Sequence, residues 1–280
     1  MPGTLYIVGT PIGNLEDITF RAVRVLREAD LIACEDTRQT RKLLEHYGVA
    51  KPVVSYHEHN EAARAAGLVE KLLQGLNVAV VSDAGTPLVA DPGYRVVKAA
   101  IEAGIRVEPV PGPSAILAAL AASGLPTDAF RFGGFLPAKR AQRRRALEAL
   151  KAERATAVFF EAPHRLLDAL EDIADVLGPG PVVIAREITK LHEEFLRGSA
   201  GELRELLAGR GAVKGEITLL IGAPQSRREE EGALEDAVGE CLRAGMGRME
   251  AMKTVARRRG ISKRQVYEAL EKARRDSPHS

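Results

Sequence analysis

The sequence predicts an α/β protein built from two α/β domains and a small C-terminal helical module. Three observations support this: a length of 280 residues, short apolar runs that alternate with amphipathic helical segments up to about residue 222, and helical spacing alone beyond residue 233. We place the domains at 1–123, 124–224 and 225–280. A change of pattern at 124–127 and a polar stretch at 225–232 mark the boundaries.

The first domain alternates strands and helices, as expected for an open parallel sheet. Ile18, Ala22 and Val25 recur at helical spacing, whereas Leu31–Cys34 is a continuous apolar run typical of a strand buried on both faces. We expect strands at 5–8, 31–34, 53–55, 78–81 and 106–110, and helices at 18–29, 41–47, 62–73, 94–103 and 114–123.

The second domain continues with short apolar runs, which predict a mixed α/β layer. We expect strands at 130–136, 156–160, 182–185, 193–197 and 216–221. We expect one helix at 139–151, a second that follows Arg165 and ends at Leu177, and a third at 200–208. Two adjacent glycines, Gly133 and Gly134, interrupt the first of these strands. In the tail, three helices follow, and Ser262 and Gln265 have the spacing of a capping box.

The loop after the predicted strand 78–81 is rich in Gly, Pro and Asp. We expect the rest of the first domain to be arranged around this loop. Ligands of open parallel sheets bind beyond the carboxyl ends of the strands, so we expect Asp83 and the backbone near Gly85 to contact one. Asp91 and Pro92 have the order of an N-cap and a first helical residue. Ser114 opens a further helix, whose N-terminus suits a polar ligand group.

Composition and motifs exclude several classes of protein. No run of 18 apolar residues is present and the N-terminus lacks signal-peptide features, so we expect a cytoplasmic protein without a membrane span. Cys34 and Cys241 fit neither a disulfide framework nor a zinc site, and His57 and His59 lack further ligands at a recognisable spacing, so we expect no metal. The loop 9–15 lacks the spacing of a P-loop or a dinucleotide fingerprint.

Charged residues follow three predicted strands: Glu35-Asp36-Thr37-Arg38, Glu161-Ala162-Pro163-His164-Arg165 and Arg186-Glu187-Ile188-Thr189-Lys190. This arrangement is typical of an active site at the carboxyl edge of a sheet. For the first set, capping of the next helix by Asp36 or Thr37 is the alternative.

The net charge of +2 is nearly neutral, but basic residues gather in two segments. Residues 138–154 hold seven basic and two acidic residues, and residues 243–280 hold eleven and four. Both segments suit contact with a polyanion, and the alternative is a solvated helix surface. In the tail, a turn at 259–262 followed by a basic helix resembles a helix-turn-helix, and a bundle that only mediates dimer contacts is the alternative.

Six motifs in this order resemble the ribosomal RNA cytidine 2′-O-methyltransferases of the tetrapyrrole methylase superfamily. The resemblance covers residues 4–222, and the tail is similar to the small C-terminal extension of that family. The motifs are Val8–Leu15, Glu35–Arg38, Ser82–Pro87 with Asp91–Gly93, Pro111–Ser114, Glu161–Arg165, and Arg186-Glu187 with Thr189-Lys190.

The resemblance implies a homodimer that binds S-adenosylmethionine between two α/β domains and methylates a decoding-site cytidine of small-subunit ribosomal RNA, either free or within the assembled subunit. It implies cofactor contacts from Pro11, Asp83, Gly85, Thr86, Val89, Ser114 and Ala115, and from Phe160, Ala185 and Thr218 in the second domain.

A ribose hydroxyl attacks more readily when a nearby group accepts its proton. By position at strand ends, the candidates are Glu161, Glu187, Glu35 and His164, and we favour Glu161 or Glu187. The expected RNA contacts are Arg38, His164, Arg165, Lys190, Lys263 and Arg264.

Two other readings stay open at this point. A relative in the same superfamily that methylates a porphyrin-like small molecule would also need basic residues. A protein without catalytic activity that binds nucleic acid and senses a metabolite would use the tail and the cleft differently.

Overall fold

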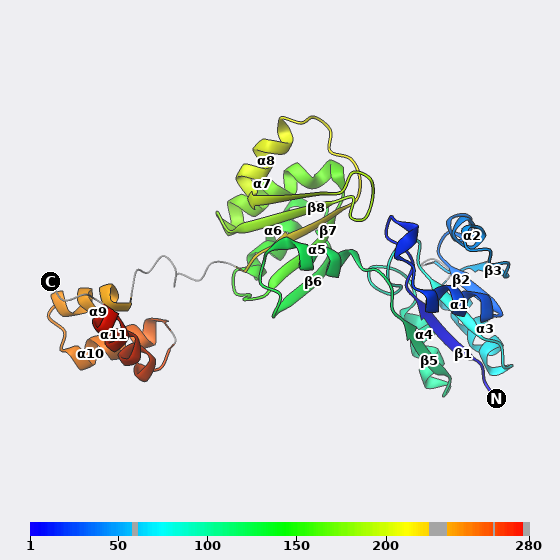
Figure 1. Cartoon of the computed structure of the whole chain (residues 1–280), viewed down its shortest axis with the longest axis horizontal. Helices are drawn as coiled ribbons and strands as arrows, with labels where there is room; N and C mark the ends of the chain where they lie inside the picture. Colours follow the sequence, from blue (N-terminus) through cyan, green and yellow to red (C-terminus); the bar gives the residue numbers. More distant parts are fainter. Residues whose placement is uncertain (58–60, 224–233, 260, 277–280) are drawn as a thin grey trace. The chain divides into compact units, whose positions relative to one another are not determined.

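A computed structural model describes residues 1–57, 61–223, 234–259 and 261–276. The chain forms two compact units, residues 1–223 and residues 224–280. The first unit contains two five-stranded sheets with their helices, and the second contains helices (Figure 1). Both predicted α/β domains therefore lie within one compact unit, and the boundaries at 123/124 and 224/225 stay predictions.

The first sheet is fully parallel, with the order β3-β2-β4-β1-β5. Its strands are β1 (Thr4–Val8), β2 (Leu31–Cys34), β3 (Val53–Ser55), β4 (Val78–Val81) and β5 (Arg106–Val110). Val8 pairs with both Val81 and Val110, and Cys34 also pairs with Val81. The loops that follow these four strands consequently start side by side at one edge of the sheet.

The helices of this half are α1 (Phe20–Glu28), α2 (Thr37–His46), α3 (Glu61–Leu73), α4 (Tyr94–Glu102) and α5 (Ala115–Ser123), with a 3-10 turn at Leu15–Asp17. The buried faces of these helices pack against the strands of the first sheet and form two hydrophobic cores. The predicted strands and helices are confirmed, although α2 begins at Thr37 because the Asp36 side chain caps it.

The predicted N-cap of α4 is wrong. Asp91 does not cap this helix, which begins at Tyr94 with Gly93 at the N-cap position. Gly93 has φ 142°, and its N–H and that of Arg95 both donate to Glu61 Oε1, at 3.1 and 3.0 Å. A carboxylate from α3 therefore replaces the local cap, which leaves Asp91 available for the loop before the helix.

The second sheet is mixed, as predicted, with the order β6-β7-β10-β8-β9. Only β6 and β7 are parallel neighbours. Its strands are β6 (Phe130–Phe135), β7 (Thr156–Glu161), β8 (Pro181–Arg186), β9 (Glu194–Ser199) and β10 (Ile217–Ile221). Its helices are α6 (Arg140–Leu150), α7 (Leu166–Leu177) and α8 (Ala200–Ala208), with a 3-10 turn at Pro163–Arg165.

The two faces of the second sheet pack against different partners. One face forms a core with α6, α7 and α8. The other contacts Ile116, Ala119 and Leu120 of α5, and Ile12 from the loop after β1 joins the same core. Residues of the first half thus complete the core on this face of the second sheet, apart from the two cores of the first sheet.

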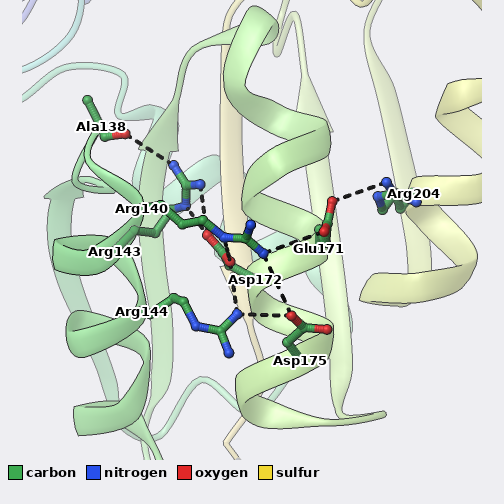
Figure 2. Close-up of polar contacts among 8 residues, drawn as sticks. All are labelled: Ala138, Arg140, Arg143, Arg144, Glu171, Asp172, Asp175 and Arg204. Atoms are coloured by element: carbon green, nitrogen blue, oxygen red, sulfur yellow. Dashed lines mark hydrogen bonds and ion pairs between the residues drawn. The ribbon is translucent and has the colours of Figure 1, made fainter.

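Three of the seven basic residues in the segment 138–154 pair with acidic residues of α7, so these three form an internal cluster. Figure 2 shows three arginines of α6 meeting the acidic face of α7. Asp172 is fully buried and accepts hydrogen bonds from Arg140, Arg143 and Arg144 at 2.8–3.0 Å. Arg143 is itself buried, so this cluster is part of the packing between the two helices.

The second unit contains α9 (Leu234–Arg243), α10 (Arg248–Arg259) and α11 (Lys263–Asp276) around a small core that includes Cys241, Met252 and Val266. The predicted capping box at the start of α11 is confirmed. The Gln265 N–H donates to Ser262 Oγ at 3.2 Å, and the Ser262 N–H donates to Gln265 Oε1 at 2.9 Å. The predicted linker 225–232, Gly260 in the turn and His59 lie outside the described residues. No helix in the described ranges is long and apolar enough to cross a membrane.

Candidate active site

A cavity of about 390 Å³ opens within the first unit, a size typical of small-molecule sites. Its wall comes from both sheets: from the first half Ile12, Asp83 to Thr86, Val89 to Asp91 and Ser114 to Ile116, and from the second Phe135, Phe160 to Pro163, Ile188 and Gly215 to Thr218. The carboxyl edge of the parallel sheet therefore faces strand ends of the mixed sheet across one cavity.

The loop between β4 and α4 forms much of this wall and has an unusual backbone. Leu88 and Ala90 have positive φ values of 73° and 66°, a conformation that costs free energy for residues with a Cβ. Two backbone hydrogen bonds between Thr10 and Gly85, at 2.9 and 3.0 Å, tie the loop to the chain after β1. These hydrogen bonds fix the start of the loop, which lines the cavity.

The same loop places two carboxylates in the wall, Asp83 and Asp91. Burial raises the pKa of Asp91 to about 6, and the charges of Glu35 and Asp83 add to this, against a hydrogen bond with Ser82. Asp83 Oδ1 accepts the N–H of Asp36 at 3.1 Å. This end of the cavity is therefore acidic and suits a cationic or hydrogen-bond-donating ligand.

The first turn of α5 lies at another part of the wall. Ser114 is its N-cap, and its hydroxyl accepts the N–H of Leu117 at 3.4 Å. A helix N-terminus offers free backbone N–H groups to an anionic ligand group. The cavity thus has an acidic end and a separate donor-rich corner.

Glu161, at the end of β7, is the most deeply buried carboxylate of the wall, with 3% of its surface exposed. Its Oε1 accepts the Ala162 N–H at 2.7 Å and pairs with Arg165 Nη2 at 2.6 Å. Its Oε2 is buried and accepts no hydrogen bond from the described part of the chain. A buried acceptor without a donor is costly, so this oxygen is suited to a donor on a ligand.

Glu187, at the end of β8, has a different environment. Its Oε1 accepts from Lys190 Nζ and from the Glu216 N–H, both at 2.9 Å. The hydrogen bond from Glu216 and the contact with Lys190 lower the pKa of Glu187. Its side chain is absent from the cavity wall, and it stabilises the turn between β8 and β9.

That turn also joins the two halves of the cavity. The Asn14 N–H donates to Thr189 Oγ1 at 3.1 Å. The side chain of Lys190 covers Gly13 so closely that a Cβ there would lie 2.4 Å from Lys190 Cγ. Because Lys190 also pairs with Glu187 and Glu216, its ammonium is already held in place.

The structure brings most of the expected cofactor residues together. Those that line the cavity are Asp83, Gly85, Thr86, Val89, Ser114, Ala115, Phe160 and Thr218. Thr218 pairs with both Phe160 and Ala185 in the sheet, but Ala185 is fully buried in the core and Pro11 is buried beside the wall without lining it.

The expected RNA-contacting residues are more dispersed. Arg38 is 84% exposed at its side chain and pairs with Asp36, whose pKa it lowers to about 2. His164 is exposed beside the cavity, whereas Arg165 is engaged with Glu161. Lys263 and Arg264 lie at the start of α11 in the second unit, and Arg264 pairs with Glu268. Glu35 is exposed and outside the wall, although its charge acts on Asp91.

Several wall residues escaped the sequence analysis, and two of them matter for the chemistry of the site. Asp91 was assigned to helix capping, and Phe135 received no role. The glycine pair before Phe135 was the available signal, because glycine inside a strand often marks a bulge next to a functional site.

The sequence profile of the tetrapyrrole (corrin/porphyrin) methylases matches residues 4–204, and the chain belongs to this family. It is therefore an S-adenosylmethionine-dependent methyltransferase.

Relatives with full-length similarity carry one name. The ribosomal RNA small subunit methyltransferase I of Halalkalibacterium halodurans is 49% identical over 95% of this chain and 93% of that protein. The protein of the same name from Escherichia coli O157:H7 is 47% identical over 96% of this chain and 95% of its own.

Solved structures share the fold. The uroporphyrin-III-C-methyltransferase from Thermus thermophilus is 25% identical, with a TM-score of 0.56 over 81% of this chain and 98% of that chain. Diphthine synthase, at 18% identity, has a TM-score of 0.63 over 79% of this chain and 90% of its own.

Proposed function

We propose that this enzyme transfers the methyl group of S-adenosylmethionine to the 2′-hydroxyl of a cytidine in small-subunit ribosomal RNA. The substrate assignment rests on the similarity, at 42–50% identity, to proteins named ribosomal RNA small subunit methyltransferase I. For most of them the alignment includes nearly the whole chain and therefore the basic tail. A porphyrin-like substrate would need no such tail.

The cavity fits the cofactor by the chemistry of its wall. Apolar side chains such as Ile12, Val89 and Ile188 suit a purine, and the N-terminus of α5 suits a carboxylate. The carboxylates of Asp83 and Asp91 suit hydroxyl donors and positive charge. We assign the cofactor to Asp83, Gly85, Thr86, Val89, Ser114, Ala115, Phe160 and Thr218, with Pro11 and Ala185 supporting the wall from behind.

When bound, the cofactor would supply an activated methyl group on a cationic sulfur, and the ribose oxygen would take that methyl in exchange for its proton. The enzyme's main tasks are then to align the hydroxyl, exclude water and accept the proton. Glu161 Oε2 is the proposed acceptor, because its partner oxygen is already engaged by Arg165 and the Ala162 N–H. Glu187 and Glu35 are weaker candidates, since neither lines the cavity.

The RNA backbone is proposed to contact Arg38 and His164 near the cavity and Lys263 and Arg264 on the tail. Arg165 and Lys190 would act mainly by positioning Glu161 and the turn after β8, given their ion pairs.

The proposal includes a homodimer and a cytoplasmic location, where ribosomal subunits are found. A sedimentation measurement tests the dimer.

The decisive experiment uses methyl-labelled S-adenosylmethionine and isolated small ribosomal subunits from a strain that lacks the enzyme. After digestion of the RNA, label on the ribose of a cytidine supports the proposal. Free RNA in parallel reactions shows which form is the substrate. Binding of the cofactor without any label on RNA would overturn the proposed substrate and favour a small-molecule acceptor.

A further inference from the structure

Phe135, the last residue of β6, is an aromatic side chain in the cavity wall with 56% of its surface exposed. We propose that its ring is the platform on which the base of the target nucleotide stacks. An RNA base can reach such a ring only when it is unpaired and turned out of its own stack. The inference rests on the proposed function and adds the conformation of the substrate and the residue that selects it.

A bulge in β6 places this ring on the cavity side. Phe132 pairs with Val158 and Phe135 with Phe160, so three steps along β6 match two steps along β7. In a regular strand, residues three apart face opposite sides of the sheet. The extra residue turns Phe135 to the same face as Phe132, which is a known use of bulges beside active sites.

The two glycines make the bulge possible. Gly134 has φ 69°, a left-handed conformation that favours glycine. At Gly133 a Cβ would lie 2.2 Å from the ring of Phe159, on the core side of the sheet. Both positions therefore serve the local geometry that directs Phe135 toward the cavity.

The ring is supported from behind, although its outer surface is free. Phe160 meets Phe135 edge to face, with ring centroids 5.6 Å apart, and meets Phe132 in the same way at 5.0 Å. Such contacts fix the orientation of an aromatic side chain. A preoriented ring with an exposed face loses little conformational entropy when a base stacks on it.

The neighbourhood of Phe135 matches a nucleotide better than an isolated apolar ligand. Glu161 lines the same cavity, and its buried Oε2, which has no donor in the described part of the chain, suits a ribose hydroxyl. The exposed His164 directly follows the wall residue Pro163 in the chain. A base on Phe135 with its ribose toward Glu161 would present the 2′-hydroxyl to the proposed proton acceptor.

The test compares Phe135→Leu with Phe135→Tyr and with the control Phe130→Leu. Phe130 lies on the same strand, is 43% exposed and is not part of the cavity wall. With unmodified small subunits as substrate, we expect Phe135→Leu to raise KM for the subunit about 10-fold or more, the size expected from loss of one base stack. Phe135→Tyr and Phe130→Leu should stay within about twofold of the wild type, and the Kd of S-adenosylmethionine, measured by calorimetry, should not change in any variant.

The outcomes separate the two proposals. If the wild type labels the subunits and Phe135→Leu has an unchanged KM, the stacking proposal is overturned and the proposed function stands. A parallel loss of cofactor affinity in Phe135→Leu would also overturn it, because the ring would then belong to the cofactor site. If the wild type binds cofactor but labels no RNA, the proposed function fails, and the stacking role fails with it.

Discussion

The turns after β7 and β8 look alike in sequence but do different things in the structure. Each follows a buried strand and carries a glutamate with a basic residue three or four positions later. Glu161 uses one carboxylate oxygen for structure and leaves the other buried without a donor in the described part of the chain. Glu187 uses its carboxylate to fix Lys190 and the Glu216 N–H, and its side chain is outside the wall.

The difference shows what separates a structural carboxylate from one that can contact a substrate. In both turns the carboxylate is paired, so the presence of an ion pair does not discriminate. The discriminating feature is a buried acceptor oxygen without a donor in the described part of the chain, on a residue that lines the cavity. By this criterion Asp172, whose oxygens are taken by three arginines, belongs with Glu187 (Figure 2).

The largest expected effect is on catalysis in Glu161→Gln. The amide keeps an oxygen for the Ala162 N–H but cannot accept the ribose proton, so kcat should fall about 10²- to 10⁴-fold. Single-turnover methyl transfer at saturating subunit and cofactor measures this. Glu187→Gln is the matched control and should keep kcat within a few fold; equal losses in the two variants would remove the distinction between the turns.

The next effect is on stability in Asp172→Ala. Burial opposes ionisation of Asp172, but hydrogen bonds from Arg144, Arg143 and Arg140 outweigh it and hold its pKa below the ordinary value. Removing the carboxylate leaves Arg143, 4% exposed at its side chain, without its partner. We expect the free energy of unfolding to fall by about 3–5 kcal/mol.

Urea unfolding measures the loss in Asp172→Ala, and Asp175→Ala provides the control. The side chain of Asp175 is 50% exposed, so its removal should cost less than about 1 kcal/mol. A small effect in both variants would show that the cluster is dispensable for folding.

A smaller loss of stability, about 1–2 kcal/mol, is expected for Glu187→Gln at neutral pH. The pKa of Glu187 is lowered in the folded protein, so the ionised carboxylate stabilises the fold above its unfolded pKa near 4.5. That contribution is lost as the pH falls through the lower folded pKa. Unfolding curves of the two proteins should therefore differ at pH 7 and converge as the pH falls below the folded pKa of Glu187; a constant difference would point to lost packing instead.

The smallest effect has the opposite sign and concerns Asp91 in the cavity. Its pKa is raised to about 6, so the folded protein binds this proton more tightly than the unfolded chain, and stability is lost as the pH rises from about 4 through 6. Asp91→Asn should be more stable than the wild type by about 1 kcal/mol at pH 7 and equally stable below pH 4. A less stable variant at pH 7 would mean that the hydrogen bond with Ser82 outweighs the cost of ionisation.

Local patterns were sufficient for the elements because apolar runs and helical spacing report burial directly. Ser262 and Gln265 form the predicted capping box, since both partners lie within one turn. The cap of α4 could not be predicted, because Glu61 reaches it from another helix. The arginines of α6 were indistinguishable from a polyanion-binding face until the acidic residues of α7 were placed opposite them.

The sequence by itself determined the order of strands and helices and the family, and eight of the residues it predicted for the cofactor line the cavity. These depend on short-range patterns and on motifs with fixed spacing. Only the tertiary structure decided which carboxylate has a free oxygen and which aromatic ring faces the cavity. The partners of Glu161 are local, Ala162 and Arg165, whereas Glu187 is also bonded by the distant Glu216 N–H. The bulge before Phe135 shows its direction only when β6 is paired with β7. Such properties depend on long-range geometry, which local sequence does not encode.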